Sequence, residues 1–197
     1  MVNERKSKRN RSTGETSISI EVNLDGKGIS NIESPIGMLN HMLDQIARHG
    51  LIDINASIKG DLETGTHHII EDTAIVLGIC IDEALGDRSG ILRMGDKTCL
   101  LDEALCSVAI DLSGRGYAVI DMGSSDNEGE FSLDMGRHFY ESLSSNGRFG
   151  IHLKMISGTN HHHILESSFK TFARAFREAA SIDPRRVDSI PSTKGSL

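Results

Sequence analysis

The chain has 197 residues, a formal net charge of −7, 38% hydrophobic residues and 25% charged residues. This composition is that of an ordinary globular protein. Its negative charge argues against general nucleic-acid binding, because phosphate backbones are bound by an excess of lysine and arginine. No apolar run approaches the length of a membrane span, so we expect no membrane partner. Three cysteines without CxxC spacing are expected to remain free thiols in a reducing compartment, which favours a cytoplasmic location.

The elements can be predicted in chain order. Residues 1–11 are locally basic, and we expect a flexible, solvated arm there because charge runs usually face water. Alternating apolar residues over 16–24 predict a half-buried strand. Apolar residues at helical spacing over 38–46, followed by a stop signal at Gly50, predict a helix. After a second alternating strand, residues 69–85 form a helical segment that is apolar nearly all round, which predicts burial between layers.

The same unit occurs twice in the chain. The aligned segments are 38–60 with 135–157, 67–71 with 162–166, and 22–28 with 110–116. The upstream alignment also pairs Glu15 with Glu103. We therefore expect a first half-repeat over residues 12–90, a second over 91–182 and a C-terminal substrate-binding tail over 183–197. Strands and helices alternate too irregularly for a parallel doubly wound sheet, so we predict an α+β fold with mainly antiparallel sheets.

Histidine and glutamate recur at matching offsets in the two halves. His67 and His68 lie four and three residues before Glu71, so either can share a helix face with it. Adjacent residues on a helix diverge by about 100°, and the two histidines therefore cannot readily bind one ion. The duplicated pattern predicts two ions that divide the ligands between them. The predicted ligands are His41, His67, His68, Glu71, His138, His162, His163 and Glu166.

The type of ligand also indicates which metal is bound. Sites that have only nitrogen and oxygen ligands and open positions suit Mn²⁺ better than structural Zn²⁺, which favours closed tetrahedral shells. Zn²⁺ and Fe²⁺ are alternatives that the same ligands could bind.

The order of the motifs resembles the imidazoleglycerol-phosphate dehydratase family over nearly the whole chain. The matching motifs are Glu15-Thr16, Asn23-Leu24-Asp25-Gly26, Asn40-His41-Met42-Leu43-Asp44-Gln45, His67-His68-Ile69-Ile70-Glu71-Asp72-Thr73, Arg93-Met94-Gly95, Asp102-Glu103-Ala104-Leu105, Asp111-Leu112-Ser113-Gly114-Arg115, Gly158-Thr159-Asn160-His161-His162-His163, Glu166, Phe169-Lys170 and Pro191-Ser192-Thr193-Lys194-Gly195. The resemblance implies a duplicated fold of the ribosomal protein S5 domain 2-like type, in which a four-helix layer lies between two four-stranded sheets. It also implies a homo-oligomer of 24 subunits, with two Mn²⁺ per active site at subunit interfaces.

The resemblance further implies a hydro-lyase of L-histidine biosynthesis. Its substrate would be D-erythro-1-(imidazol-4-yl)glycerol 3-phosphate, and its products imidazole acetol phosphate and water. By the same resemblance, Glu15 lies near the glycerol part of the substrate. The residues expected to hold the phosphate are Gln45, Arg93, Arg115, Lys170, Ser192 and Lys194. Asn40 stands where the family usually has aspartate, and an amide brings no negative charge to the neighbouring ligand.

The chemistry implied by the resemblance needs an unusual source of electrons. The hydrogen to be removed is on the middle carbon of the glycerol, which has no carbonyl neighbour. Two cations on the ring nitrogens would favour an imidazolate, which would expel the hydroxyl next to the ring and form a diazafulvene. A carboxylate must then move the proton; Glu15 is the first candidate, with Asp102 and Glu103 in reserve.

Two other functions remain open from the sequence. A di-metal phosphohydrolase would use the same ions to activate water, and it predicts release of phosphate from the substrate. A non-catalytic metal-storage shell would also bind ions through glutamate and histidine on buried helices, as ferritin-like proteins do. The storage function leaves Ser192, Lys194 and Arg115 without a role.

Overall fold

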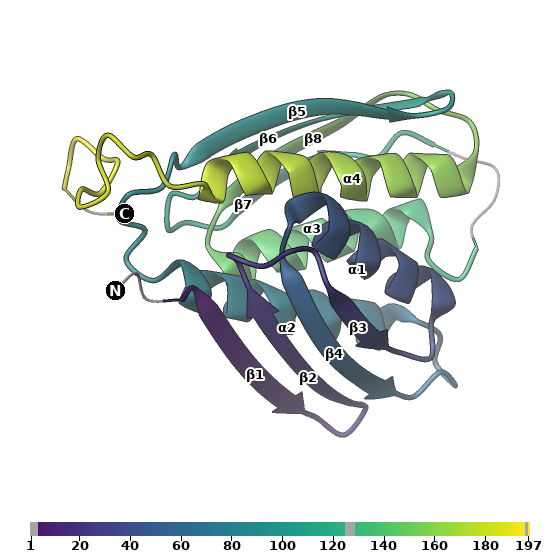
Figure 1. Cartoon of the computed structure of the whole chain (residues 1–197). Helices are drawn as coiled ribbons and strands as arrows, with labels where there is room; N and C mark the ends of the chain where they lie inside the picture. Colours follow the sequence, from purple (N-terminus) through teal and green to yellow (C-terminus); the bar gives the residue numbers. More distant parts are fainter. Residues whose placement is uncertain (1–3, 125–128, 196) are drawn as a thin grey trace.

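The structure is a computed structural model that describes residues 4–124, 129–195 and 197. Within these residues, a layer of four helices lies between two four-stranded sheets, as Figure 1 shows. The strands are β1 (Lys6–Ser12), β2 (Thr16–Asn23), β3 (Ser30–Glu33), β4 (Asp53–Gly60), β5 (Met94–Leu101), β6 (Ala104–Asp111), β7 (Tyr117–Asp121) and β8 (Gly150–Ser157). The helices are α1 (Gly37–Gly50), α2 (His67–Leu85), α3 (Leu133–Gly147) and α4 (His161–Ala180). The predicted α+β fold is confirmed.

The two sheets have the same topology. Their strand orders are β1-β2-β4-β3 and β5-β6-β8-β7. In each sheet the last pair, β3 with β4 or β7 with β8, is parallel and the other pairs are antiparallel. The order strand, strand, strand, helix, strand, helix thus occurs twice along the chain, which is the structural form of the internal repeat.

The helices of the two halves are interleaved. Helix α2 packs on the first sheet and α4 on the second. Among the helices, however, α2 lies chiefly against α3, and α1 lies chiefly against α4. Each of these close pairs joins one helix from each half of the chain, so the two halves share one helical layer.

The apolar pattern of the sequence explains most of these elements. The predicted strand over 16–24 is β2, whose alternate residues face the core, and the predicted helix over 38–46 is α1. The predicted buried helix is α2, with apolar side chains such as Ile69, Val76 and Cys80 fully covered. None of the described helices is both long enough and apolar enough to span a bilayer.

The expectation of a flexible arm over residues 1–11 is wrong for Lys6 onward, because strand β1 begins there and pairs antiparallel with β2. The inward side chains of this edge strand are polar and bind acidic residues of α2. Arg9 Nε donates to Glu83 Oε1 over 2.6 Å, and Arg11 lies 2.6 Å from a carboxylate oxygen of Asp72. Since ion pairs replace apolar contacts on this strand, its sequence has no apolar alternation to detect.

Candidate metal centres and substrate-binding residues

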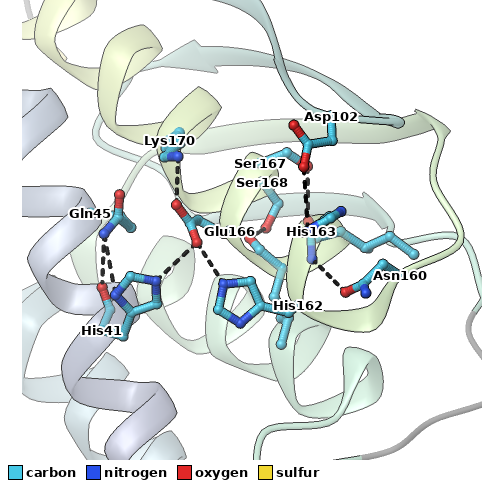
Figure 2. A network of polar contacts seen from close by, with 12 residues as sticks. His41, Gln45, Asp102, Asn160, His162, His163, Glu166, Ser167, Ser168 and Lys170 are labelled. Atoms are coloured by element: carbon cyan, nitrogen blue, oxygen red, sulfur yellow. Dashed lines mark hydrogen bonds and ion pairs between the residues drawn. The ribbon is translucent and has the colours of Figure 1, made fainter.

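Three side chains meet where α1 lies beside the first two turns of α4 (Figure 2). His41 Nε2 of α1 is 2.9 Å from Glu166 Oε2, and His162 Nε2 is 2.8 Å from the same oxygen. The spacing of His162 and Glu166 on α4 is i,i+4, which places both on one helix face. The two imidazole rings stack with centroids 5.4 Å apart. We call this group the α1–α4 cluster.

A second group repeats this arrangement between α2 and α3. His67 Nε2 and His138 Nε2 each lie 3.4 Å from a carboxylate oxygen of Glu71. The rings of His67 and His138 have centroids 4.8 Å apart. We call this group the α2–α3 cluster. Its members are the repeat partners of the α1–α4 cluster, and each cluster draws residues from both halves of the chain.

The donor atoms of both clusters fit a divalent metal ion. In each cluster the two imidazole nitrogens and one carboxylate oxygen lie within 4.8 Å of one another. Neutral imidazole and carboxylate are suitable ligands for first-row divalent metals. His138 Nε2 is buried, lies 3.4 Å from Glu71 and forms no hydrogen bond among the described residues. This nitrogen can therefore donate its electron pair to a metal ion. Three protein ligands also leave room for others.

His68 and His163 lie outside both clusters in the same chain. Adjacent residues on a helix point in directions about 100° apart, so each of these histidines faces other neighbours than His67 and His162 do. The structure therefore brings together six of the eight predicted ligands in two groups of three. The two remaining imidazoles face carboxylates of their own half. His68 faces Glu15, and His163 faces Glu103 with Nδ1 and Asp102, at 3.7 Å, with Nε2.

Two further predicted residues border the α1–α4 cluster. Lys170 Nζ is 2.5 Å from Glu166 Oε1, one helix turn along α4, and Gln45 Nε2 is 3.4 Å from His41 Nδ1. Burial opposes ionisation of Glu166, but hydrogen bonds from Lys170, His41 and His162 outweigh it and lower the pKa of Glu166 to about 2. The carboxylate is therefore charged at neutral pH.

Asn40, one of the departures from the family pattern, also has a structural role. Its Nδ2 donates a hydrogen bond of 3.1 Å to the backbone oxygen of Ser34. An ionised aspartate has no proton to donate there. The amide thus fixes the segment that enters α1, one residue before His41.

The other predicted phosphate-binding residues gather at the far end of α4. The backbone N–H of Arg93 donates to the oxygen of Ala179, and its side chain binds Asp111 and the backbone oxygen of Pro191. Because Pro191 immediately precedes Ser192, the tail that carries Ser192 and Lys194 lies beside Arg93. Ala179 follows His162 by 17 residues, which is about 25 Å along a helix.

Arg115 borders a hollow on the outer face of the second sheet. This cavity has a volume of about 600 Å³, and its lining includes Met94, Asp111, Tyr117 and His152. Arg115 is exposed there and follows Gly114, whose surroundings include the chain end at Leu197. One chain therefore separates the predicted phosphate-binding residues into two groups, one beside the α1–α4 cluster and one beyond the C-terminal end of α4.

Sequence reasoning missed how differently Glu15 and Glu103 are held. Glu103 accepts hydrogen bonds from the backbone N–H groups of Thr159 and Asn160 and contacts His163 at 2.7 Å. The hydrogen bond with His163, followed by that from Asn160, lowers the pKa of Glu103 to about 2. The side chain of Glu15 is 57% exposed and lies 3.5 Å from His68. The available signal was the loop before the His-His pair, which is two residues shorter in the second half.

Comparisons with known proteins show the family of this chain. A sequence model of the family described as imidazoleglycerol-phosphate dehydratase matches residues 34–176, a range that includes all eight histidines and glutamates predicted as ligands. The imidazoleglycerol-phosphate dehydratase of Dehalococcoides mccartyi is 48% identical over 188 residues, which cover 95% of this chain and 94% of that protein. The enzyme of Cereibacter sphaeroides is 45% identical over 194 residues, with 98% and 100% coverage.

Solved structures show the same fold. The chain resembles the imidazoleglycerol-phosphate dehydratase of Pyrococcus furiosus with a TM-score of 0.83 and 32% identity, over 96% of this chain and 100% of that one. For the Staphylococcus aureus enzyme the TM-score is 0.81 and the identity 30%, over 90% and 99% of the two chains. The chain belongs to the imidazoleglycerol-phosphate dehydratase family, hydro-lyases of histidine biosynthesis.

Proposed function

We propose that this chain dehydrates D-erythro-1-(imidazol-4-yl)glycerol 3-phosphate to imidazole acetol phosphate and water, with two Mn²⁺ ions per active site. The observation that supports it best is the pair of equivalent clusters, each with two imidazoles and one carboxylate within 4.8 Å. His68 and His163, which lie outside the clusters of their own chain, are the fourth ligands in this proposal. Ligand sets of nitrogen and oxygen with open positions favour Mn²⁺ over structural Zn²⁺.

Each cluster offers the same donors, two imidazole nitrogens and one carboxylate oxygen. We therefore assign one ion to each of the two nitrogens of the substrate's imidazole ring. The ions, when bound, supply the positive charge that favours loss of the ring proton. The electron-rich ring would then expel the neighbouring hydroxyl, which would leave as water with the proton given up by the ring, and a diazafulvene would form. Lys170 and Gln45, beside the α1–α4 cluster, would orient the substrate next to Glu166 and His41.

Glu15 is proposed to remove the hydrogen from the middle carbon of the glycerol. Its carboxylate is exposed and only loosely engaged, at 3.5 Å from His68 Nδ1. Its repeat partner Glu103 is held by two backbone N–H groups and His163. A proton carrier must be free to change its partner during the reaction, which favours Glu15. The enol left by removal of this proton becomes the ketone of the product.

Arg93 and the tail, which are expected to hold the phosphate, lie far from the α1–α4 cluster of their own chain. Arg93 and the tail lie about 25 Å along α4 from His162, whereas the substrate consists of one small ring, a three-carbon chain and a phosphate. One substrate cannot span that distance within a single chain. We therefore propose a homo-oligomer, with 24 subunits as in the resemblance, in which Arg93, Arg115, Ser192 and Lys194 serve an active site at an interface.

Metal removal tests this interface. If the ions join ligands from different chains, a chelator should release smaller species, because metal binding is then linked to assembly. Size-exclusion chromatography before and after chelation measures this change. An assembly of unchanged size at every chelator concentration would contradict interfacial ions.

Glu15→Gln tests the proposed chemistry. The change keeps shape and hydrogen bonding but removes basicity, so kcat should fall about 10²- to 10⁴-fold while the chain still binds two Mn²⁺. Loss of an ion would instead make Glu15 a ligand, and a near-normal kcat would exclude it as the proton carrier. Parallel assays for the ketone and for free phosphate separate the dehydratase from a phosphohydrolase, and a storage shell would produce neither.

The three cysteines Cys80, Cys99 and Cys106 are free thiols in the structure. Free thiols persist in reducing compartments, and on this ground we propose a cytoplasmic location.

A further inference from the structure

The two halves differ most in the loop before each His-His pair. In the first half residues 61–66 separate the end of β4 from His67, whereas in the second half residues 158–161 separate the end of β8 from His162. The shorter loop brings the N-terminus of α4 close to the turn between β5 and β6. That turn carries Glu103, the repeat partner of Glu15.

Glu103 uses its two carboxylate oxygens for two different purposes. Oε1 accepts hydrogen bonds from the backbone N–H groups of Asn160, at 2.8 Å, and Thr159, at 3.2 Å. Oε2 lies 2.7 Å from Nδ1 of His163. Asn160 in turn caps α4, because its side-chain oxygen accepts from the backbone N–H of His163 (Figure 2). The loop, the helix start and the imidazole are thus held by one carboxylate.

The first half has no equivalent arrangement among its described residues. Glu15 Oε2 is 3.5 Å from His68 Nδ1, and Thr64 Oγ1 approaches the same nitrogen at 3.4 Å. The residue before α2, Thr66, makes no side-chain hydrogen bond that caps the helix. His68 therefore lacks the short carboxylate contact that fixes His163.

We propose that Glu103 is a positioning residue that fixes His163 with its proton on Nδ1 and presents Nε2 to the metal. A carboxylate that accepts the other ring N–H of a metal-binding histidine sets both its tautomer and its orientation. This inference rests on the proposed metal pair. It assigns the two equivalent glutamates to different tasks: Glu103 orients a ligand, and Glu15 is left free for proton transfer.

Glu103→Gln separates orientation of His163 from clamping of the loop. The amide oxygen can still accept from Thr159 and Asn160, which keeps the loop in place. The NH₂ group then faces His163 Nδ1 and can only donate, so Nδ1 becomes the acceptor and the proton moves to Nε2. A protonated Nε2 cannot bind a metal ion.

The measurement is calorimetric titration of Mn²⁺ alone into the metal-free full-length protein, where the wild-type chain should bind two ions. In Glu103→Gln the ion that His163 binds should have a 10- to 100-fold larger Kd, the usual effect of losing such a partner, while the other is unchanged. The matched control Glu15→Gln should bind both ions with wild-type affinity. Adding Glu103→Gln to His163→Ala should have no further effect, because Glu103 acts through that ring.

Three results would overturn the proposal. Wild-type affinity for both ions in Glu103→Gln would limit Glu103 to clamping the loop. An additive loss in the double variant would show that Glu103 acts independently of His163. A wild-type chain that binds fewer than two Mn²⁺ would refute the proposed metal pair itself, and with it this role of Glu103. A normal melting temperature of Glu103→Gln confirms that the compared proteins are folded.

Discussion

Gly78→Ala should loosen the contact between α2 and α3 that holds the α2–α3 cluster together. A methyl group at this position would lie 2.8 Å from the backbone nitrogen of Gly147 and 2.8 Å from the backbone oxygen of Leu143. Ordinary van der Waals contacts of a Cβ atom begin at 3.4 Å. To reach that ordinary contact distance, the two helices must separate by about 0.6 Å. The contacting atoms belong to the backbone and cannot rotate away as a side chain can.

Two opposing effects determine the change in stability. Overpacking of a core costs about 1–3 kcal/mol, and two rigid backbone contacts place Gly78→Ala near the upper end. Alanine in a helix interior recovers about 1 kcal/mol relative to glycine. The free energy of unfolding should therefore fall by about 1–2 kcal/mol. For a chain of this size, at about 2–4 °C per kcal/mol, the melting temperature should drop by about 2–8 °C.

The repeat supplies a matched control. Ala173 of α4 aligns with Gly78 and is fully buried. It lies in the equivalent contact between α4 and α1, because a methyl group at Gly50 of α1 would be 3.6 Å from the backbone oxygen of Ala173. Ala173→Gly should also lower the melting temperature, by the roughly 1 kcal/mol of helix preference, but it does not push two helices apart. Scanning calorimetry at a fixed protein concentration measures the two melting temperatures. Titration with Mn²⁺ should show weakened metal binding only in Gly78→Ala. An unchanged or higher melting temperature of Gly78→Ala would refute the packing argument.

Three other outcomes follow from the described contacts. Burial raises the pKa of the Cys106 thiol to about 12, so iodoacetamide at pH 8 should label Cys99 well before Cys106; equal labelling rates by mass spectrometry would contradict this. The hydrogen bond from Arg5 lowers the pKa of Asp25, so Asp25 stabilises the fold above its unfolded pKa, and this contribution is lost as pH falls through the folded value. Asp25→Asn should thus melt a few degrees lower at pH 7, with a gap that narrows below about pH 4; a gap independent of pH would exclude the ion pair. Truncation after Ile190 should raise KM about tenfold or more, equivalent to about 1.4 kcal/mol per decade, with little change in melting temperature; an unchanged KM would remove the tail from the phosphate site.

Periodicity predicted the elements that bury apolar side chains and failed for those that do not. Strand β2 and helices α1 and α2 follow directly from their apolar spacing. Strand β1 faces α2 with arginine and serine, and β3 has a single apolar residue, Ile32, in four. Such strands exist because a neighbouring strand offers hydrogen-bonding partners, which is a property of the assembled sheet and not of the local sequence.

The ligand types could be predicted from the repeat, but their grouping could not. Both His67 and His68 can share a helix face with Glu71, and only the structure shows that His67, at i,i+4, is the one that faces Glu71. The third member, His138, comes from the other half of the chain because α2 packs against α3. Which helices meet depends on long-range packing, and local spacing contains no information on it.

The interleaved helical layer has a consequence for how the duplication arose. Because each cluster takes one helix from each half, a single half-length chain could not have assembled either cluster. Two such chains related by a two-fold axis would have formed both clusters as identical sites. Any mutation would then have changed the two sites together. Fusion of the two copies into one polypeptide removed that symmetry. Each position could then change alone, and a loop shorter by two residues on one side is a change that a symmetric pair could not have made.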